Sequence, residues 1–155
     1  MKTLYLYILL ILLIWGCNNE KNCSSPPSEL YFKIIKNNQE YQGNKIDSLQ
    51  IFYYKNGIKN YIADLIWLKE INGYAISTTN VLYSNQLSTI SGLENINQFF
   101  FQFPDNDIDT LSYKLIKQSN SSNCSYYQTS ENKYNGKNAT MEASLSSLSV
   151  VKFVE

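Results

Sequence analysis

The segment at residues 49–65, LQIFYYKNGIKNYIADL, decides the fold class. Two runs rich in β-branched and aromatic residues lie on either side of Asn56 and Gly57. Because both central residues tolerate the positive φ of a type I′ turn, this pattern predicts a β-hairpin. The second run and the residues after it also fit one face of a helix, through Ile58, Tyr61, Ile62, Leu65 and Leu68. We favour a strand, because asparagine-glycine pairs stand at both ends and strand-forming residues occur between them.

Other segments around this hairpin have the period of two that half-buried strands show. Residues 30–36 place Leu30, Phe32 and Ile34 on one face, and residues 110–117 alternate in the same way. Further strands are expected at residues 99–103 and 150–154, with turns at Asn72-Gly73 and Asn135-Gly136.

Several short strands separated by turns predict one all-β domain over residues 29–155. We expect an antiparallel β-sandwich of roughly seven or eight strands, immunoglobulin-like or similar. A small β-barrel is the alternative fold. Residues 84–95 fit either a loop or a short helix. The length of the chain, 155 residues, suits a single domain.

The charge composition excludes several classes of function. The chain has 13 basic and 13 acidic residues, so its formal net charge is zero, and every basic residue is a lysine. A neutral chain without arginine lacks the field and the bidentate phosphate contacts that are typical of nucleic-acid binding. Because the chain has no histidine, it cannot build a Ser–His or Cys–His nucleophilic site by itself. We therefore expect no nucleic-acid partner and no cofactor.

The amino-terminal region combines a basic start, an apolar run and a cysteine. Lys2 precedes an uncharged stretch at residues 4–15, LYLYILLILLIW, which is shorter than the roughly twenty residues of a membrane-spanning helix. This stretch predicts a signal-peptide helix. The motif Ile14-Trp15-Gly16-Cys17 then resembles the lipobox of bacterial lipoproteins, although its tryptophan is larger than the residue usual there. The resemblance implies that residues 1–16 are cleaved off and that acylated Cys17 anchors the chain in a lipid bilayer.

Two other interpretations of this region stay open, namely an uncleaved anchor and an ordinary secretory signal with a chance cysteine. Residues 17–28 are rich in Asn, Ser and Pro, and they predict a flexible tether between the lipid and the domain. The residue after Cys17 is Asn18, and in this it resembles lipoproteins that are sent on to the outer membrane. The expected location is therefore the cell envelope, on the outer membrane, with the periplasmic and the surface-facing leaflets both open.

Cys23 and Cys124 are the cysteines that remain after Cys17. Because an exported protein meets an oxidising compartment, we expect a structural disulfide between them, and free thiols are the alternative. The bond would close a loop of about one hundred residues and attach the tether to the hairpin region.

Asp105, Asp107 and Asp109 occupy alternate positions in an acidic turn. Oxygens at alternate residues of a loop can converge on a calcium ion, so these three are the candidate metal ligands. The turn lacks the glycine and the bidentate glutamate of an EF-hand loop. Aspartates are also common in solvated turns, because they hydrogen-bond to their own backbone, and we favour that interpretation.

The region after the signal peptide is similar to small, uncharacterised lipoproteins of Bacteroidota. The features that carry the resemblance are the lipobox with its polar tether, the run Asp107-Ile108-Asp109-Thr110-Leu111, Cys124 followed by Tyr126-Tyr127, and Tyr134-Asn135-Gly136. The resemblance implies a fold and a location. It implies no activity, because these lipoproteins share no general activity.

The expected function is that of a non-enzymatic binding or structural module of the envelope, with a protein or a glycan as its partner. A hydrolase with two carboxylates is one alternative, since such pairs can meet from distant positions in the sequence. A calcium-stabilised surface module is the other alternative.

Overall fold

The computed structural model describes residues 23–155 apart from 69, 72–73, 76–79, 122–123 and 143–148. The predicted signal peptide and Cys17 lie outside the described residues, as does the turn predicted at Asn72-Gly73. In the part of the chain that is described, no helix has the length and apolar character needed to cross a membrane.

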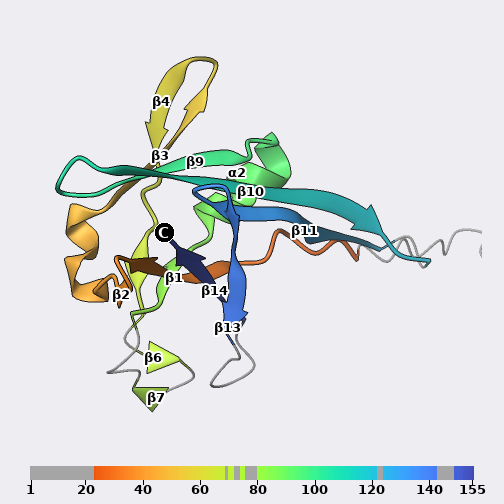
Figure 1. Cartoon of the computed structure of the whole chain (residues 1–155). Helices are drawn as coiled ribbons and strands as arrows, with labels where there is room; N and C mark the ends of the chain where they lie inside the picture. Colours follow the sequence, from red (N-terminus) through yellow and green to blue (C-terminus); the bar gives the residue numbers. More distant parts are fainter. Residues whose placement is uncertain (1–22, 69, 72–73, 76–79, 122–123, 143–148) are drawn as a thin grey trace, which may run out of the picture.

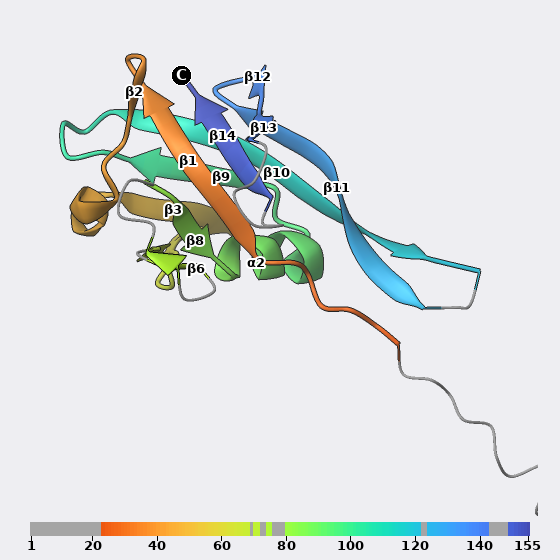
Figure 2. The same ribbon diagram turned by 90° about the horizontal axis from the view of Figure 1, so that it is seen from below.

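Two sheets form the body of the domain, as Figure 1 and Figure 2 show. The strand order in the first sheet is β13 (Thr140–Glu142), β14 (Val150–Val154), β1 (Leu30–Lys36), β8 (Leu82–Ser84) and β5 (Ile66–Trp67), with β2 (Gln39–Glu40) paired to β1. The order in the second sheet is β12 (Lys137–Asn138), β11 (Ser125–Tyr134), β10 (Ile108–Ser119), β9 (Gln98–Gln102), β3 (Gln50–Lys55) and β4 (Ile58–Tyr61). A separate pair consists of β6 (Glu70–Ile71) and β7 (Tyr74–Ala75), and one 3-10 helix, η1 (Gly43–Ser48), follows β2. Within the described residues the sheets do not close into a barrel, so the predicted all-β, sandwich-like fold is confirmed.

The prediction of purely antiparallel strands is wrong at one place. β1 and β14 pair in parallel, with Ile34 opposite Phe153. They are the first and last strands described, so most of the domain forms the long connection that parallel neighbours need. Turn patterns could not predict this pairing, because no hairpin joins the two strands. The pairing brings Glu155 beside β1, where its amide donates to the carbonyl oxygen of Ile35 at 3.0 Å.

Aromatic rings fill the centre of the space between the sheets. Phe32 and Phe153 of the first sheet meet Phe101 and Tyr134 of the second, and all four are fully buried. The ring centroids are 5.9 Å apart for Phe32 and Phe101, and 5.2 Å apart for Tyr134 and Phe153. Each such pair adds about 0.5–1.5 kcal/mol beyond the burial of its area. Tyr134 also carries a hydroxyl into this core, and that hydroxyl needs a partner there.

Two of the predicted asparagine-glycine turns have the expected backbone. Asn56 and Gly57 have φ angles of 53° and 77°, and Asn135 and Gly136 have φ angles of 48° and 77°. Positive φ at both positions is what a type I′ hairpin turn requires. The strand predicted over residues 58–65 is shorter in the structure, since β4 covers only its first four residues.

The mixed segment at residues 84–95 contains a helix, α2 (Gln86–Glu94). Its N-cap residue, Asn85, makes no capping hydrogen bond with its own side chain. The Asp64 carboxylate instead accepts hydrogen bonds from the backbone amides of Asn85 and Gln86, each at 2.8 Å, and from Ser84 Oγ at 2.7 Å. A carboxylate at this position satisfies amides that have no partner within the helix and interacts favourably with the helix dipole. Because Asp64 is used in this way, the chain leaves the sheet before residue 65.

The end of the expected tether contacts the domain at three places. Cys23 forms a disulfide with Cys124, and their Cα atoms are 4.9 Å apart. The amide of Ser25 donates to the carbonyl oxygen of Ser125 at 2.9 Å, and Pro27 is buried. From Cys23 onward, the segment expected to be flexible is therefore held against the domain.

Gly92 of α2 leaves the space that Pro27 occupies. A methyl group at position 92 would lie 2.9 Å from Pro27 Cγ and 3.0 Å from two ring carbons of Tyr127. Alanine in place of glycine normally stabilises a helix by about 1 kcal/mol. Here we expect Gly92→Ala to destabilise the domain by about 1–3 kcal/mol, because the added group overpacks the contact. Urea denaturation of the variant measures this, with Leu93→Ala, at an exposed position of the same helix, as the control. A Gly92→Ala variant more stable than the wild type would contradict the packing.

Candidate functional site

Asp109 is a carboxylate buried beside the aromatic core, with 3% of its surface exposed. The hydroxyl of Tyr134 donates to Asp109 Oδ2 at 2.6 Å, and Asn135 Nδ2 donates to Oδ1 at 2.7 Å. The amide of Thr110 in turn donates to Asn135 Oδ1 at 2.8 Å. Burial and the hydrogen bond to the Asp109 carboxylate raise the pKa of Tyr134, so its hydroxyl stays a donor. Asp109 thus supplies the partner that Tyr134 needs and ties β10 to the turn after β11.

Lys36, at the end of β1, is surrounded by three carboxylates, and we call these four residues the Lys36 cluster. Its ammonium contacts Asp107 Oδ2 and lies 3.6 Å from Asp109 Oδ2 and 3.4 Å from Glu155 Oε2. The side chain is 15% exposed, and the ammonium also lies 4.4 Å from the ring centroid of Phe103. Burial lowers the pKa of Lys36, but the hydrogen bond to Asp107 and the charges of the three carboxylates outweigh it, so the pKa is raised.

The Lys36 cluster changes the interpretation of the acidic turn as a calcium site. Carboxylate oxygens of Asp107, Asp109 and Glu155 lie within 4.8 Å of one another, whereas Asp105 is not part of this group. The Oδ1 atom of Asp105 accepts a hydrogen bond from the amide of Asp107 at 3.2 Å, as in a solvated turn. A cation at the group would have to displace the ammonium of Lys36. One positive charge from the protein, the ammonium of Lys36, therefore already lies among the three converging carboxylates.

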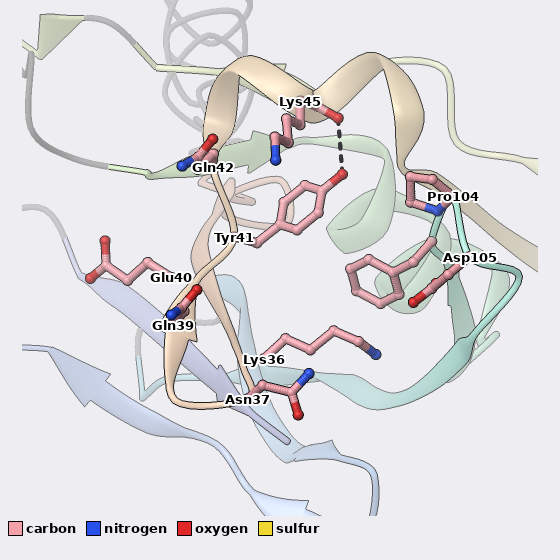
Figure 3. Close-up of a pocket in the computed structure, with 10 residues that line it drawn as sticks. Lys36, Asn37, Gln39, Glu40, Tyr41, Gln42, Lys45, Pro104 and Asp105 are labelled. Carbon is pink, nitrogen blue, oxygen red and sulfur yellow. Dashed lines mark hydrogen bonds between the residues drawn. The ribbon is translucent and has the colours of Figure 1, made fainter.

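A pocket of about 390 Å³ opens beside the Lys36 cluster, between the β1–β2 turn, η1 and the loop after β9. Figure 3 shows its lining residues, which are Lys36, Asn37, Gln39, Glu40, Tyr41, Gln42, Lys45, Phe103, Pro104 and Asp105. The rings of Tyr41 and Phe103 meet edge to face with their centroids 5.4 Å apart. The hydroxyl of Tyr41 donates to the carbonyl oxygen of Lys45 at 2.9 Å, which fixes the ring against η1. Tyr41 and Phe103 thus give the pocket an aromatic wall.

Three side-chain amides stand around this wall, those of Asn37, Gln39 and Gln42. All three residues are exposed, and no hydrogen bond joins their amide groups to another part of the described chain. Each primary amide carries two N–H donors and one carbonyl acceptor. The pocket therefore combines an aromatic wall with amide groups that are available to a ligand.

No family model, curated protein or solved structure matches this chain. The chemistry of the pocket itself is therefore the basis for assigning a ligand. Of the residues singled out in the sequence, only Asp105 lines the pocket. Lys36 and Tyr41 gave no signal, because a lysine at a strand end and a tyrosine in a polar turn are ordinary in such sequences.

β2, which borders the pocket, and the start of β11, next to Cys124 of the disulfide, lie at opposite ends of the domain, as Figure 1 and Figure 2 both show. β10 connects the two ends, since Ile108 follows Asp107 of the Lys36 cluster and Ser119 pairs with Ser125, next to Cys124. A strand of twelve residues at about 3.4 Å per residue spans about 40 Å. The N-terminal segment therefore joins the domain far from the pocket.

A second surface carries aromatic side chains on the outer face of the second sheet, and we call it the β3–β4 surface. Phe52 and Phe100 stack with centroids 5.1 Å apart, and Lys59 Nζ lies 3.7 Å from the Phe52 centroid. Tyr54 and Tyr61 are 52% and 55% exposed, whereas Phe52 is buried beneath its neighbours. This surface is aromatic and exposed. Its rings, however, stack on one another, and its lysine lies over one of them.

The Lys36 cluster predicts how stability depends on pH. The hydrogen bond and the charge of Lys36 lower the pKa of Asp107 below its ordinary 3.8, so that pair stabilises the fold above about pH 4 and is lost as pH falls through the lowered value. The raised pKa of Lys36 means that its contribution is complete below its ordinary 10.5 and is lost as pH rises through the raised value. We expect the free energy of unfolding, measured with urea, to be level in between and to fall at both ends. A level profile down to pH 2 would contradict this.

Proposed function

We propose that the chain is a lipid-anchored protein of the cell envelope whose domain is a non-catalytic binding module, with the pocket beside the Lys36 cluster as its binding site. The observation that carries this proposal is the position of the pocket. β2, which borders the pocket, lies at one end of the domain, and the start of β11 lies at the other end, where the disulfide of Cys124 holds the N-terminal segment. A ligand bound in the pocket would approach from the side away from the anchor.

The sequence before Cys23 supports the anchor. Residues 14–17 resemble a lipobox in Ile14, Gly16 and Cys17, and the apolar run before them has the length of a signal-peptide hydrophobic region. Cys17 and Cys23 are six residues apart, and six residues span at most about 20 Å when fully extended. Lipid on Cys17 would therefore hold the Cys124 end of the domain close to the bilayer. If β10 points away from the bilayer, the pocket lies on the outward side of the domain.

The arrangement of carboxylates supports binding rather than hydrolysis. A glycosidase needs two carboxyl groups on either side of the bond that breaks, one of them held protonated. Asp107, Asp109 and Glu155 instead share the ammonium of Lys36. Glu40 of the pocket accepts hydrogen bonds from Lys33 and Asn80, each at 3.2 Å. Each of these carboxylates is therefore already in contact with a protein partner.

Site-specific photo-crosslinking in native membranes tests the binding site. The photoreactive residue replaces Lys45 at the pocket, Tyr54 on the β3–β4 surface, or Tyr126 at the disulfide end, all of which are exposed. We expect an adduct from position 45 and none from the other two. An adduct from position 54 alone would move the binding site to the β3–β4 surface, and no adduct from any position would contradict a binding role.

The same membranes test the anchor. Cys17→Ser removes the thiol that would carry the lipid, so the full chain should pass from the membrane fraction to the soluble fraction. If the variant stays with the membrane as the wild type does, the lipid anchor at Cys17 is wrong.

A further inference from the structure

The charges around the pocket disfavour an anionic ligand. Its lining carries two ammonium groups, from Lys36 and Lys45, and two carboxylates, from Glu40 and Asp105. Three further carboxylates, those of Asp107, Asp109 and Glu155, lie around the ammonium of Lys36. An anionic ligand would meet this surplus of negative charge, and the Lys36 ammonium already hydrogen-bonds to Asp107 and lies 3.6 Å from Asp109 Oδ2 and 3.4 Å from Glu155 Oε2. The electrostatic surroundings therefore disfavour phosphates and acidic chains.

The polar groups that remain available are side-chain amides. Asn37, Gln39 and Gln42 can each donate and accept hydrogen bonds at the same end of the side chain. Hydroxyl groups on neighbouring carbons of a sugar ring also donate and accept, and they match an amide in both roles. β2 has only two residues and pairs with β1 alone, so an extended peptide would find few backbone partners along its edge.

The aromatic wall supplies the apolar contact that such a ligand needs. A sugar ring has faces of C–H groups, and tyrosine offers an apolar ring with a polar tip. Figure 3 shows Tyr41 in the middle of the pocket, with Lys45 on one side of it and Lys36 on the other. Pro104 and Phe103 continue the apolar lining. A volume of about 390 Å³ is at the small end of ligand pockets, and the pocket is open to solvent, so a chain could continue beyond it.

We infer that the pocket binds a neutral saccharide chain, with Gln39 and Gln42 bonding its hydroxyls and Tyr41 contacting its C–H face. This inference rests on the proposed binding function and names the ligand class of the same site. No bond is made or broken in this binding.

Saturation-transfer NMR on the full chain tests the inference. The chain is kept in a polyoxyethylene detergent, because glycoside detergents would compete for the site. The probes are neutral hexasaccharides of glucose, mannose, xylose and N-acetylglucosamine, with hexagalacturonate as the anionic probe. We expect saturation transfer to at least one neutral hexasaccharide and weaker binding of hexagalacturonate.

The double variant Gln39→Ala/Gln42→Ala should weaken that binding at least tenfold. Both positions are exposed, so the fold should not depend on them. The matched control is Gln50→Ala/Gln128→Ala, which removes two exposed amides elsewhere and should leave binding unchanged. Tighter binding of hexagalacturonate, an unchanged affinity in the pocket variant, or no transfer to any neutral probe would each overturn the inference.

The crosslinking experiment separates this failure from failure of the proposed function. If position 45 still gives an adduct while no neutral saccharide binds, the binding module stands and the ligand class is wrong. If position 45 gives no adduct and no saccharide binds, both proposals fail.

Discussion

Replacing Lys36 with methionine is expected to destabilise the domain by about 3 kcal/mol, near the low end of what removing one partner of a buried ion pair costs. Three carboxylates lie around the ammonium, and that of Asp109 is only 4% exposed. Without Lys36, Asp109 would keep a charge in the protein interior beside two like charges. Urea denaturation at pH 7 measures the loss. A Lys36→Met variant as stable as the wild type would show that the cluster does not support the fold.

The control for this variant is Lys55→Met. Lys55 pairs with Glu94 at 2.7 Å, but about half of the lysine side chain is exposed. Exposed ion pairs contribute little to stability, so we expect almost no change in the urea midpoint.

The Lys36→Met variant should also respond to pH in the opposite direction from the wild type. With the ammonium gone, protonation of one of the clustered carboxylates relieves the repulsion among them. The variant should therefore become more stable as pH falls from 7 toward 5, whereas the wild type should not change over that range. Equal slopes for the two proteins would contradict the proposed charge balance.

Removing the disulfide is expected to have the largest effect on stability. Cys23 and Cys124 are 101 positions apart, and the chain-entropy model gives about 4.7 kcal/mol for closing a loop of that size. The variant Cys23→Ala/Cys124→Ala should lose most of this, because its unfolded chain is no longer cross-linked. Urea denaturation of the oxidised wild type and of the variant measures the difference.

A reducing agent supplies the control for the disulfide. It should bring the wild type close to the double variant and leave the double variant unchanged. The amide of Ser25, bonded to Ser125 in the structure, should then lose protection from hydrogen exchange, since its segment is held only by that bond and by Pro27. If the double variant matches the oxidised wild type in stability, the disulfide does not hold the N-terminal segment to the domain.

The strands could be predicted where local sequence decides them. β1 and β14 have the predicted bounds, because each is an apolar run within a polar surrounding. The turns at Asn56 and Asn135 were predictable because a positive φ favours asparagine and glycine. These features depend on a few neighbouring residues, and the sequence shows those residues side by side.

Features that depend on distant residues could not be predicted. α2 is capped by Asp64, which lies more than twenty positions before it in the sequence. A buried serine of α2 also bonds to β10. Ser91 Oγ donates a hydrogen bond to the carbonyl oxygen of Tyr113 and accepts one from the amide of Leu115. The sequence of this segment alone fitted either a loop or a short helix. The helix therefore follows from tertiary contacts rather than from its own pattern.

The candidate site shows the same limit. The acidic turn stood out in the sequence, but its meaning depends on Lys36, which is 71 positions away from Asp107. Glu155 joins the cluster because β14 lies in parallel beside β1, a pairing with no local signal. The pocket could not be predicted for the same reason, since its walls come from the β1–β2 turn, η1 and the loop after β9.

The proposed orientation depends on lipid at one end of the domain and a ligand at the other. An intact-mass spectrum of the protein extracted from its native membranes tests the first half most directly. We expect a polypeptide that begins at Cys17, carries the mass of acyl chains on that residue, and has no free thiol at Cys23 or Cys124. A polypeptide that begins at Met1, or one with an unmodified thiol at residue 17, would contradict the proposal.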